Sequence, residues 1–172
     1  MIIHQITGFT NSGKTTIMTE LIAYLSDLGY RVCTIKHHGH TDSLKPEYEP
    51  KDSMKHRNAG AKASLVYSDQ NELQLIADQT PEKLTLEQLI SLYSVFHFDI
   101  LLIEGYKHAG YPKTFVMRDQ DRKTGLSDFK HVKATISQGP AEQPGTTPVF
   151  QRDRLDEYFE WFLKSIVKEG SS

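Results

Sequence analysis

The spacing of apolar residues predicts a chain that alternates strands with helices. Residues 2–7 carry three isoleucines, which is typical of a short buried strand, and residues 31–36 form a second one. Between them, apolar residues recur at helical spacing and stop before Gly29, a suitable helix C-cap. Because such a strand, helix and strand form a right-handed crossover, the two strands should be parallel. The opening pattern therefore predicts an α/β fold.

The middle of the chain predicts a short helix followed by a hairpin. Asp52 is placed to cap a helix that runs to about Ala59, and Gly60 ends it. Residues 63–67 and 73–77 have strand character and flank a turn, so we expect them to pair antiparallel, as a hairpin at one edge of the sheet.

The second half of the chain continues the alternation. Thr85 and Gln88 have capping-box spacing at the head of a helix. Residues 99–103 are almost wholly apolar and should therefore form a central strand. The remaining predicted elements are strands at residues 114–117 and 132–137 and a final amphipathic helix capped by Asp153.

Composition narrows the class of protein. The 172 residues, 38% hydrophobic and 24% charged, suit one domain, which we expect at residues 1–168 with a tail at 169–172. A formal net charge of −2 gives no general attraction to polyanions, so neither nucleic acid nor a membrane is an expected partner. Cys33 is the only cysteine, and the sequence shows neither a signal-peptide pattern nor an apolar run of about 20 residues. We therefore expect a cytoplasmic protein.

The strongest chemical signal lies between the first strand and the first helix. Residues 8–15, Gly-Phe-Thr-Asn-Ser-Gly-Lys-Thr, match the pattern G-x-x-x-x-G-K-[ST] of phosphate-binding loops. The glycines let backbone N–H groups point at phosphate oxygens, and the helix N-terminus adds partial positive charge. Lys14 would reach the β- and γ-phosphates of a nucleoside triphosphate, and the Thr15 hydroxyl would bind Mg²⁺. The residues of this loop that we assign to nucleotide binding are Gly8, Thr10, Asn11, Ser12, Gly13, Lys14, Thr15 and Thr16.

The motif and the element order together predict a three-layer P-loop NTPase fold, with a mostly parallel central sheet and an antiparallel hairpin at one edge. In such sheets ligands bind at the carboxyl ends of the strands. Glu104 directly follows the apolar residues 100–103, so we assign it to the Mg²⁺ site with Thr15. The alternative is a surface glutamate placed there by chance. Asp99 begins the same strand, about 17 Å away, and is expected to cap a turn instead.

Polar residues also follow the second predicted strand. Lys36 and His37 stand at its end, and Arg57 lies in the short helix beyond. We expect these three side chains to contact phosphate or substrate. A zinc site formed by His37, His38 and His40 is the alternative, although adjacent histidines at a strand end point to different faces.

Asp52 has two interpretations. As a helix cap it needs no ligand, whereas at a junction of loop and helix it could face Mg²⁺ or orient an attacking water. With the second interpretation, the predicted metal ligands are Thr15, Glu104 and Asp52. The predicted catalytic residues are then Lys14, Asp52 and Glu104.

A locally basic segment follows Glu104. It contains Lys107, Lys113, Arg118 and Arg122. These cations could receive an anionic second ligand or a partner surface. A solvated loop with scattered charges is the equally good alternative.

Four blocks of the sequence resemble one known family. They are residues 8–16, residues 35–40 (Ile-Lys-His-His-Gly-His), residues 51–61 (Lys-Asp-Ser to Ala-Gly-Ala) and residues 103–107 (Ile-Glu-Gly-Tyr-Lys). Together they resemble the MobB family of molybdopterin-guanine dinucleotide biosynthesis proteins, over most of the chain to about Arg118.

The resemblance implies a homodimer that binds GTP with Mg²⁺ and hydrolyses it weakly. Such a protein assists the molybdenum cofactor guanylyltransferase that joins molybdopterin to GMP, with molybdopterin itself as a further candidate partner. It is an accessory protein and at most a weak GTPase, not the transferase. The chain has no Asn-Lys-x-Asp signature of regulatory GTPases, so the preference for GTP rests on the resemblance alone.

A P-loop small-molecule kinase is the competing hypothesis. In that case the segment from Lys107 to Arg122 would close over an acceptor and neutralise charge during phosphoryl transfer. Kinases of this fold usually bring several arginines to the γ-phosphate, and here Arg118 and Arg122 are the only plausible pair near that loop. This difference favours the nucleotide-binding adaptor.

Overall fold

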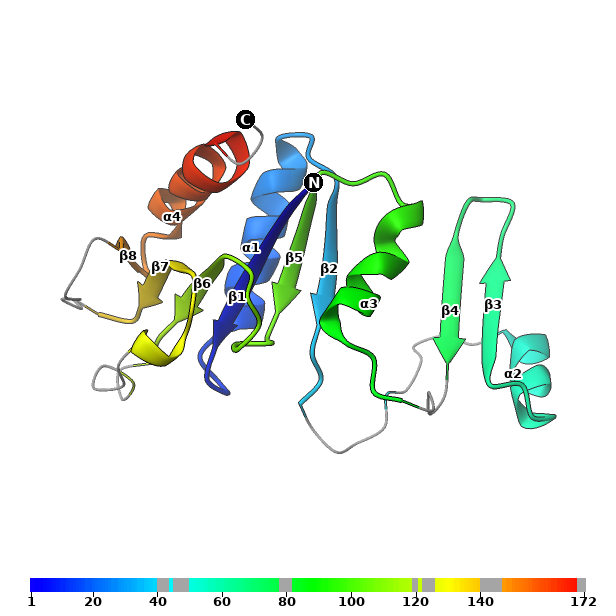
Figure 1. Ribbon diagram of the computed structural model, residues 1–172. Coiled ribbons are helices and arrows are strands. Elements are labelled where there is room, and N and C mark those ends of the chain that lie inside the picture. Colours follow the sequence, from blue (N-terminus) through cyan, green and yellow to red (C-terminus); the bar gives the residue numbers. More distant parts are fainter. Residues whose placement is uncertain are drawn as a thin grey trace. The chain divides into compact units, whose positions relative to one another are not determined.

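The secondary structure follows the alternation that the sequence predicts (Figure 1). The computed structural model describes residues 1–39, 44, 50–77, 82–118, 121, 126–139 and 147–169. The chain forms two compact units, which we call the large-sheet unit (residues 1–38 and 89–172) and the hairpin unit (residues 39–88). In the described ranges, no helix is long and apolar enough to cross a bilayer. The predicted single domain at residues 1–168 stays a prediction.

The large-sheet unit holds most of the regular structure. Its elements are β1 (Ile2–Gly8), α1 (Lys14–Asp27), β2 (Val32–Lys36), the 3-10 turn η1 (Leu92–Val95), β5 (Ile100–Glu104), β6 (Lys113–Val116), the 3-10 turn η3 (Leu126–Asp128), β7 (Val132–Ser137), β8 (Val149–Gln151), α4 (Leu155–Trp161) and its π-helical continuation η4 (Phe162–Lys168). The hairpin unit contains α2 (Lys51–Asn58), β3 (Ala63–Tyr67) and β4 (Leu73–Ala77), and α3 (Leu86–Ser91) spans the boundary.

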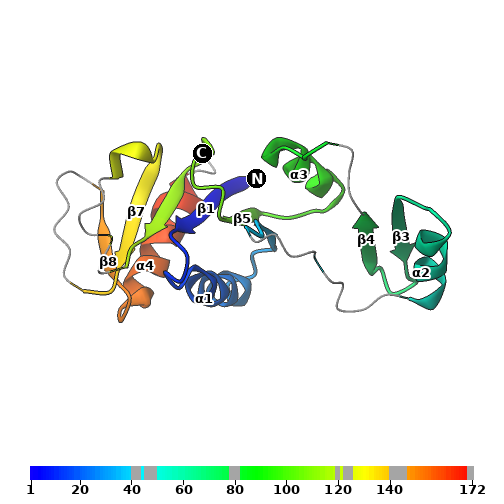
Figure 2. The same ribbon diagram turned by 90° about the horizontal axis from the view of Figure 1, so that it is seen from below.

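Six strands form one parallel sheet in the order β2-β5-β1-β6-β7-β8 (Figure 1). Figure 2 shows this sheet from below. β5 lies between β2 and β1 and is buried along its whole length, which confirms the predicted central strand. Because β2, β5 and β1 are parallel, their carboxyl ends lie at one edge of the sheet. The short strand β8, paired with β7, was not predicted.

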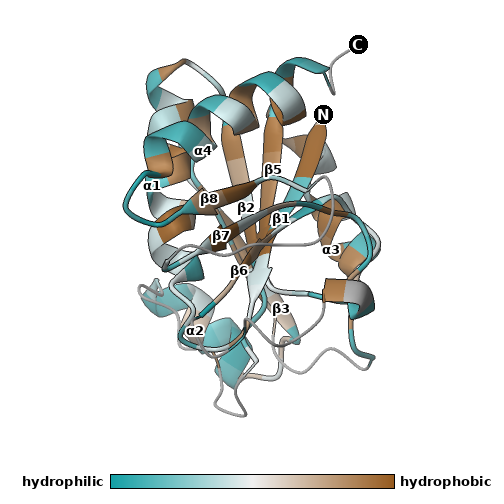
Figure 3. Cartoon of the chain, turned by 90° about the vertical axis from the view of Figure 1, so that its left-hand side faces the viewer, coloured by the Kyte–Doolittle hydropathy of each residue, from teal (hydrophilic) through white to brown (hydrophobic). Residues whose placement is uncertain are grey.

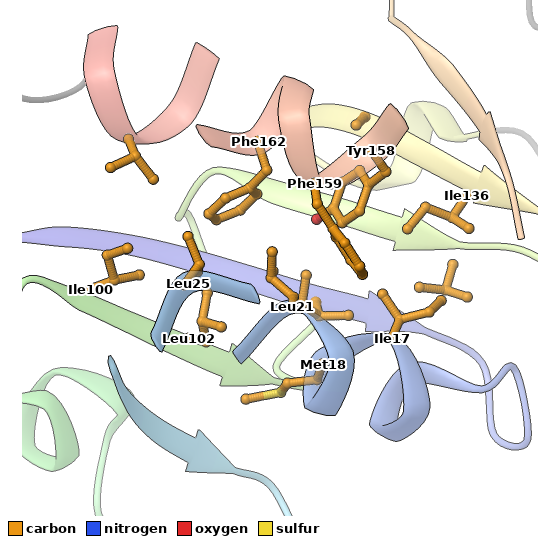
Figure 4. Close-up of a cluster of buried hydrophobic side chains, with 14 residues drawn as sticks. Ile17, Met18, Leu21, Leu25, Ile100, Leu102, Ile136, Tyr158, Phe159 and Phe162 are labelled. Carbon is orange, nitrogen blue, oxygen red and sulfur yellow. The ribbon is translucent and has the colours of Figure 1, made fainter. Parts of the chain in front are cut away.

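The main hydrophobic core lies between this sheet and the helices α1 and α4 (Figure 4). Ile17, Leu21 and Leu25 recur at helical spacing on α1 and are fully buried. Burying each such side chain contributes roughly 1.5–3 kcal/mol. Figure 4 shows them facing Tyr158, Phe159 and Phe162 of the C-terminal helix and Ile100 and Leu102 of β5. This packing fixes α1, and with it the start of the phosphate-loop helix.

A short polar chain crosses the same core. The His4 Nε2 atom lies 2.9 Å from Thr114 Oγ1, which lies 2.9 Å from the Tyr158 hydroxyl oxygen. The three side chains therefore join β1, β6 and α4. Burial is the main cause that lowers the pKa of His4 to about 3, and the nearby Lys113 and Lys133 charges add to it. The imidazole is thus neutral at physiological pH.

The hairpin unit confirms the predicted antiparallel pair, β3 with β4. The pair forms a separate two-stranded sheet and not, as predicted, an edge of the large sheet. One face of this sheet is apolar and exposed. Its residues are Ala63, Leu65, Tyr67, Leu73, Leu75 and Ala77. Cross-strand pairs such as Leu65 with Leu75 and Tyr67 with Leu73 make this apolar face continuous. In Figure 3, by contrast, the residues of α2 have mostly hydrophilic colours.

The helix starts were predicted with mixed success. Thr85 N donates to Gln88 Oε1 at 2.8 Å and Gln88 N donates to Thr85 Oγ1 at 3.2 Å, which confirms the capping box. Asp52 is not an N-cap, because Pro50 occupies that position and Asp52 lies in the first helical turn. Asp153 was also assigned wrongly, since Arg154 precedes the last helix and makes no side-chain capping bond.

Candidate functional site

The loop between β1 and α1 has a backbone that requires its glycines. Gly8 has φ +150°, and a Cβ there would lie 2.3 Å from the carbonyl oxygen of Val116. Gly13 has φ +79°, and a Cβ there would lie 1.9 Å from a guanidinium nitrogen of Arg152. Both separations are shorter than any real contact, so larger residues would displace the loop or its neighbours. The motif therefore takes the tight, glycine-dependent conformation that its sequence predicts.

Lys14 is the first residue of α1, and its side chain reaches back across this loop. Its Nζ atom donates to the backbone carbonyl of Phe9 at 2.7 Å, which draws the ammonium across the loop. Burial is the main cause that lowers the pKa of Lys14, while the Glu104 carboxylate opposes that shift. Lys36, Lys107 and Arg118 act on Lys14 as further positive charges. An anion placed here would relieve this like-charge repulsion.

Glu104 and Thr15 meet as the sequence predicts. The Thr15 hydroxyl donates to Glu104 Oε1 at 3.1 Å, so the two predicted metal ligands are adjacent. Glu104 is buried, with 8% of its surface exposed. Lys36 Nζ donates to both carboxylate oxygens at 2.9 Å each and lies 3.3 Å from Thr15 Oγ1. A hydroxyl beside a carboxylate is a donor set suited to Mg²⁺, and its present partner is also a cation.

The end of β2 brings His37 to the same edge of the sheet, beside the turn after β5. His37 N donates to the Glu104 carbonyl at 3.0 Å, and its ring lies 4.7 Å from the Tyr106 ring. Gly105 has φ +100°, and a Cβ there would come within 3.1 Å of His37 Cβ. Gln5 Nε2 donates to the carbonyls of Gly105 and Tyr106 at 3.0 and 2.9 Å, which ties the turn after β5 to β1.

The zinc alternative gains no support from the described residues. Across the residues that the structure describes, no three His, Cys, Asp or Glu side chains gather where they could hold a metal ion. His40, the third histidine of that alternative, lies outside these residues.

Two cations of the basic segment flank Phe9 at the start of the loop. Lys107 Nζ lies 5.0 Å and Arg118 Cζ 5.2 Å from the Phe9 ring centroid, both within cation–π range. Arg118 Nη1 also donates to the Thr10 carbonyl at 3.0 Å. The Arg118 ion pair with Asp121, at 2.7 Å, lowers the pKa of that carboxyl. The predicted basic segment thus supplies positive charge beside the phosphate loop.

Lys113 has a different role. Its side chain is fully buried, and its ammonium donates to the carbonyls of Lys107 and Ala109. Burial lowers the pKa of Lys113. It therefore shapes the turn that carries Lys107. The other cation predicted for this segment, Arg122, lies outside the described residues.

Two further predicted site residues, Asp52 and Arg57, belong to the hairpin unit. Asp52 is exposed and pairs with Lys55 at 2.8 Å, and Arg57 is half-buried, both within the hairpin unit. Their predicted approach to the phosphates stays a prediction. Asp99 accepts bonds from the backbone and guanidinium of Arg31, which tie the start of β2 to that of β5. This ion pair lowers the pKa of Asp99 to about 2.

Sequence reasoning missed Arg152. This residue directly follows β8, and its guanidinium donates to the Ser12 carbonyl beneath the phosphate loop. It also lines a pocket of about 400 Å³ beside the C-terminal end of the loop. The pocket residues are Thr16, Ile17, Glu20, Arg152, Asp153, Leu155, Asp156 and Phe159. No local motif marks Arg152, because its partner is 140 residues away in the sequence.

Comparisons with known proteins identify the family of this chain. Residues 3–138 match the sequence model of the family described as molybdopterin guanine dinucleotide synthesis protein B. The chain is 37% identical over 117 residues to a probable molybdopterin-guanine dinucleotide biosynthesis adapter protein of Bacillus subtilis (strain 168). That match covers 68% of this chain and 65% of the relative, so the chain spans just under two thirds of the relative's length.

Two further relatives are similar over more of their length. The molybdopterin-guanine dinucleotide biosynthesis adapter protein of Escherichia coli (strain K12) is 35% identical over 136 residues, which is 77% of this chain and 76% of that protein. The crystal structure of a MobB protein homolog from Bacillus stearothermophilus has a TM-score of 0.76 and 30% identity, and the match covers 96% of this chain and 98% of that one. The predicted fold class and the resemblance are both confirmed.

Proposed function

The chain belongs to the molybdopterin guanine dinucleotide synthesis protein B family, and we propose that it is an Mg-GTP-binding accessory protein of molybdopterin guanine dinucleotide biosynthesis. In this role it assists the guanylyltransferase of the pathway and hydrolyses GTP only weakly. The observation that carries the proposal is the phosphate loop, with the Lys14 side chain reaching back across it and Thr15 beside Glu104. Relatives whose names include an adapter role in the same pathway support it.

The charges around the loop suit a triphosphate. Lys36, Lys107 and Arg118 are close enough to Lys14 to lower its pKa, and among the described residues Glu104 is the carboxylate that opposes this shift. A triphosphate with Mg²⁺ would relieve the repulsion between these cations. The Thr15 hydroxyl and the Glu104 carboxylate would hold the Mg²⁺, which when bound neutralises phosphate charge. Asp52 remains our candidate for orienting water.

A pocket beside the loop supports the proposal for the nucleoside end of the ligand. The pocket that includes Thr16 and Arg152 adjoins the loop and has a volume of about 400 Å³. Sites for small molecules occupy roughly 300–1,000 Å³. Asp153 and Asp156 line it, and a carboxylate accepts hydrogen bonds from the N–H groups of guanine, as it does from the amino group of cytosine. The choice of GTP over ATP nevertheless rests on family membership.

We also propose a homodimer, with the exposed apolar face of β3 and β4 as part of the contact. A two-stranded hairpin alone is marginally stable, so a covering partner would stabilise it. Because the same face on a second copy is equally apolar, a two-fold contact is self-complementary.

A small-molecule kinase is the second candidate. Lys107 and Arg118 lie beside the loop and favour it, because phosphoryl transfer needs positive charge at the transferred group. This alternative requires a metabolite that accepts the phosphoryl group, whereas the accessory role does not.

The deciding experiment is calorimetric titration with Mg-GTP and Mg-ATP, beside phosphate release measured without a partner. We expect GTP to bind at least tenfold more tightly than ATP, and turnover to stay far below the usual enzymatic range of roughly 1–1,000 per second. Lys14→Met should weaken GTP binding by about a hundredfold, and Lys164→Met, an exposed lysine of η4, is the matched control. Tight ATP binding, or rapid release on adding a metabolite, would instead establish the kinase.

A further inference from the structure

Lys36 makes an unusual set of bonds for a strand-end lysine. Its ammonium contacts both carboxylate oxygens of Glu104 at 2.9 Å each and the Thr15 hydroxyl oxygen at 3.3 Å. These are the oxygens of the two residues assigned to Mg²⁺. The two candidate metal ligands, Thr15 and Glu104, therefore already contact one cation, the ammonium of Lys36.

The sheet register puts this cation there. Lys36 and Glu104 are directly opposite each other at the carboxyl ends of the parallel strands β2 and β5. The two side chains differ in freedom, since the Glu104 side chain is 11% exposed and that of Lys36 is 55% exposed. The carboxylate is held in place, while the ammonium reaches it from solvent on a flexible stem. Lys36 is accordingly the partner that can leave.

We propose that Lys36 competes with Mg²⁺ for Thr15 and Glu104, and that it changes partner, from Glu104 to the terminal phosphate, when magnesium nucleotide binds. The inference rests on the proposed nucleotide function. Without nucleotide, the ammonium neutralises a buried carboxylate that would otherwise repel a triphosphate. With Mg²⁺ on the two oxygens, the displaced ammonium repels the metal and is drawn to the nearest unpaired anion, which in GTP is the γ-phosphate.

This exchange makes magnesium binding depend on the γ-phosphate. With GTP, the lysine gains a new ionic partner for the one it loses. With GDP, the lysine loses its ion pair with Glu104 and gains no new ionic partner, so nothing offsets the loss when Mg²⁺ displaces it. Magnesium should therefore bind more weakly beside GDP than beside GTP, and Lys36 should cause that difference.

The test measures binding and needs no turnover. The affinity for nucleotide is measured over a range of Mg²⁺ concentrations, once with GDP and once with a non-hydrolysable GTP analogue. The proteins compared are the wild type, Lys36→Met, Lys36→Arg and the control Lys164→Met. Lys36→Met should lower the half-saturating Mg²⁺ concentration about five- to tenfold with GDP, because half-exposed charge-assisted hydrogen bonds contribute modestly. The change with the GTP analogue should be smaller, and Lys36→Arg should stay near the wild type.

A second readout follows the ammonium directly. In NMR spectra of protein with ¹⁵N-labelled lysine, the side-chain resonance absent from Lys36→Met belongs to Lys36. Adding the magnesium complex of the GTP analogue should shift it, and adding magnesium-free analogue should not. An unshifted resonance would contradict the exchange.

The outcomes separate this inference from the proposed function. The proposed function stands if the wild type binds Mg-GTP and Glu104→Gln removes the Mg²⁺ dependence of that binding. If, in addition, Lys36→Met has the same half-saturating Mg²⁺ concentration as the wild type with both nucleotides, then Lys36 does not compete and only the inference fails. If the wild type binds neither nucleotide, both ideas fail. A lower half-saturating Mg²⁺ concentration in Lys36→Met, larger with GDP, establishes the competition.

Discussion

The large-sheet unit buries its apolar side chains, whereas the hairpin unit exposes those on one face of its sheet. In the large-sheet unit, helices α1 and α4 cover the parallel sheet, and side chains such as Leu21 and Phe162 are completely buried. In the hairpin unit, the β3–β4 sheet exposes its leucines: Leu65 is 58% and Leu75 is 49% exposed. A parallel sheet requires crossover helices that cover it, whereas a hairpin requires only a turn.

The difference affects what each unit offers to a ligand or a partner. The covered sheet fixes both ends of the predicted phosphate loop, because Ile6 of β1 and Ile17 of α1 are part of the core. The uncovered hairpin presents a surface that is suited to a partner. The large-sheet unit therefore holds its core side chains in place, whereas the hairpin unit leaves an apolar face exposed.

The largest expected effect concerns the buried histidine of the large-sheet unit. In the unfolded chain, His4 takes a proton near pH 6.5, whereas in the folded core its pKa is about 3. The unfolded state therefore binds more protons between these values, and stability that is complete above pH 6.5 is lost as the pH falls toward 3. His4 alone should account for about 4 to 5 kcal/mol of this loss.

Denaturant unfolding from pH 7.5 to 3.5 measures this contribution. His4→Gln should show a clearly flatter pH dependence than the wild type, even if it is less stable at pH 7. His97→Gln, which changes an exposed histidine, should leave the profile unchanged. Parallel profiles for the wild type and His4→Gln would show that the buried imidazole is not neutral.

A pair of matched truncations compares the two units directly. Leu21→Ala empties space in the core and should lower the free energy of unfolding by about 3 kcal/mol. Leu75→Ala, on the exposed hairpin face, should lower it by less than about 1 kcal/mol in the monomer. Denaturant titrations of both variants at low protein concentration measure the difference. Equal losses would mean that the hairpin face is covered as thoroughly as the core.

The hairpin face should matter more for association than for folding. Leu75→Glu would place a charge in the proposed two-fold contact and should weaken the dimer at least about tenfold. Analytical ultracentrifugation over a range of concentrations measures this, with Leu28→Glu, an exposed leucine of the large-sheet unit, as the control. A dimer that survives Leu75→Glu would locate the contact elsewhere.

The smallest expected effect tests whether the hairpin unit takes part in hydrolysis. Asp52→Asn should lower the slow release of phosphate a few-fold while GTP affinity stays the same, because a water-orienting group acts mainly in the transition state. Comparing single-turnover rates with calorimetric affinities separates the two quantities. Equal rates in the variant and the wild type would remove Asp52 from the catalytic set.

Much of the fold could be predicted because it depends on local patterns. Helix α1, the hairpin and the central strand β5 each carry a periodicity or capping signal within a few residues. β8 was missed because three residues are too few to show a period. The two wrong caps, Asp52 and Asp153, have the right residue type near a helix start, but the chain enters each helix at a neighbouring residue.

By itself the sequence predicted the position and backbone conformation of the loop between β1 and α1. Its glycines set a backbone geometry that is local to nine residues, and Lys14 belongs to the same short motif. Only the tertiary structure decided which side chains surround that loop. The parallel register of β2 and β5 brought Lys36 to Glu104, and β8 brought Arg152 beneath Ser12. Such pairs join residues about 70 and 140 positions apart, and strand order, which a local pattern does not encode, determines their meeting.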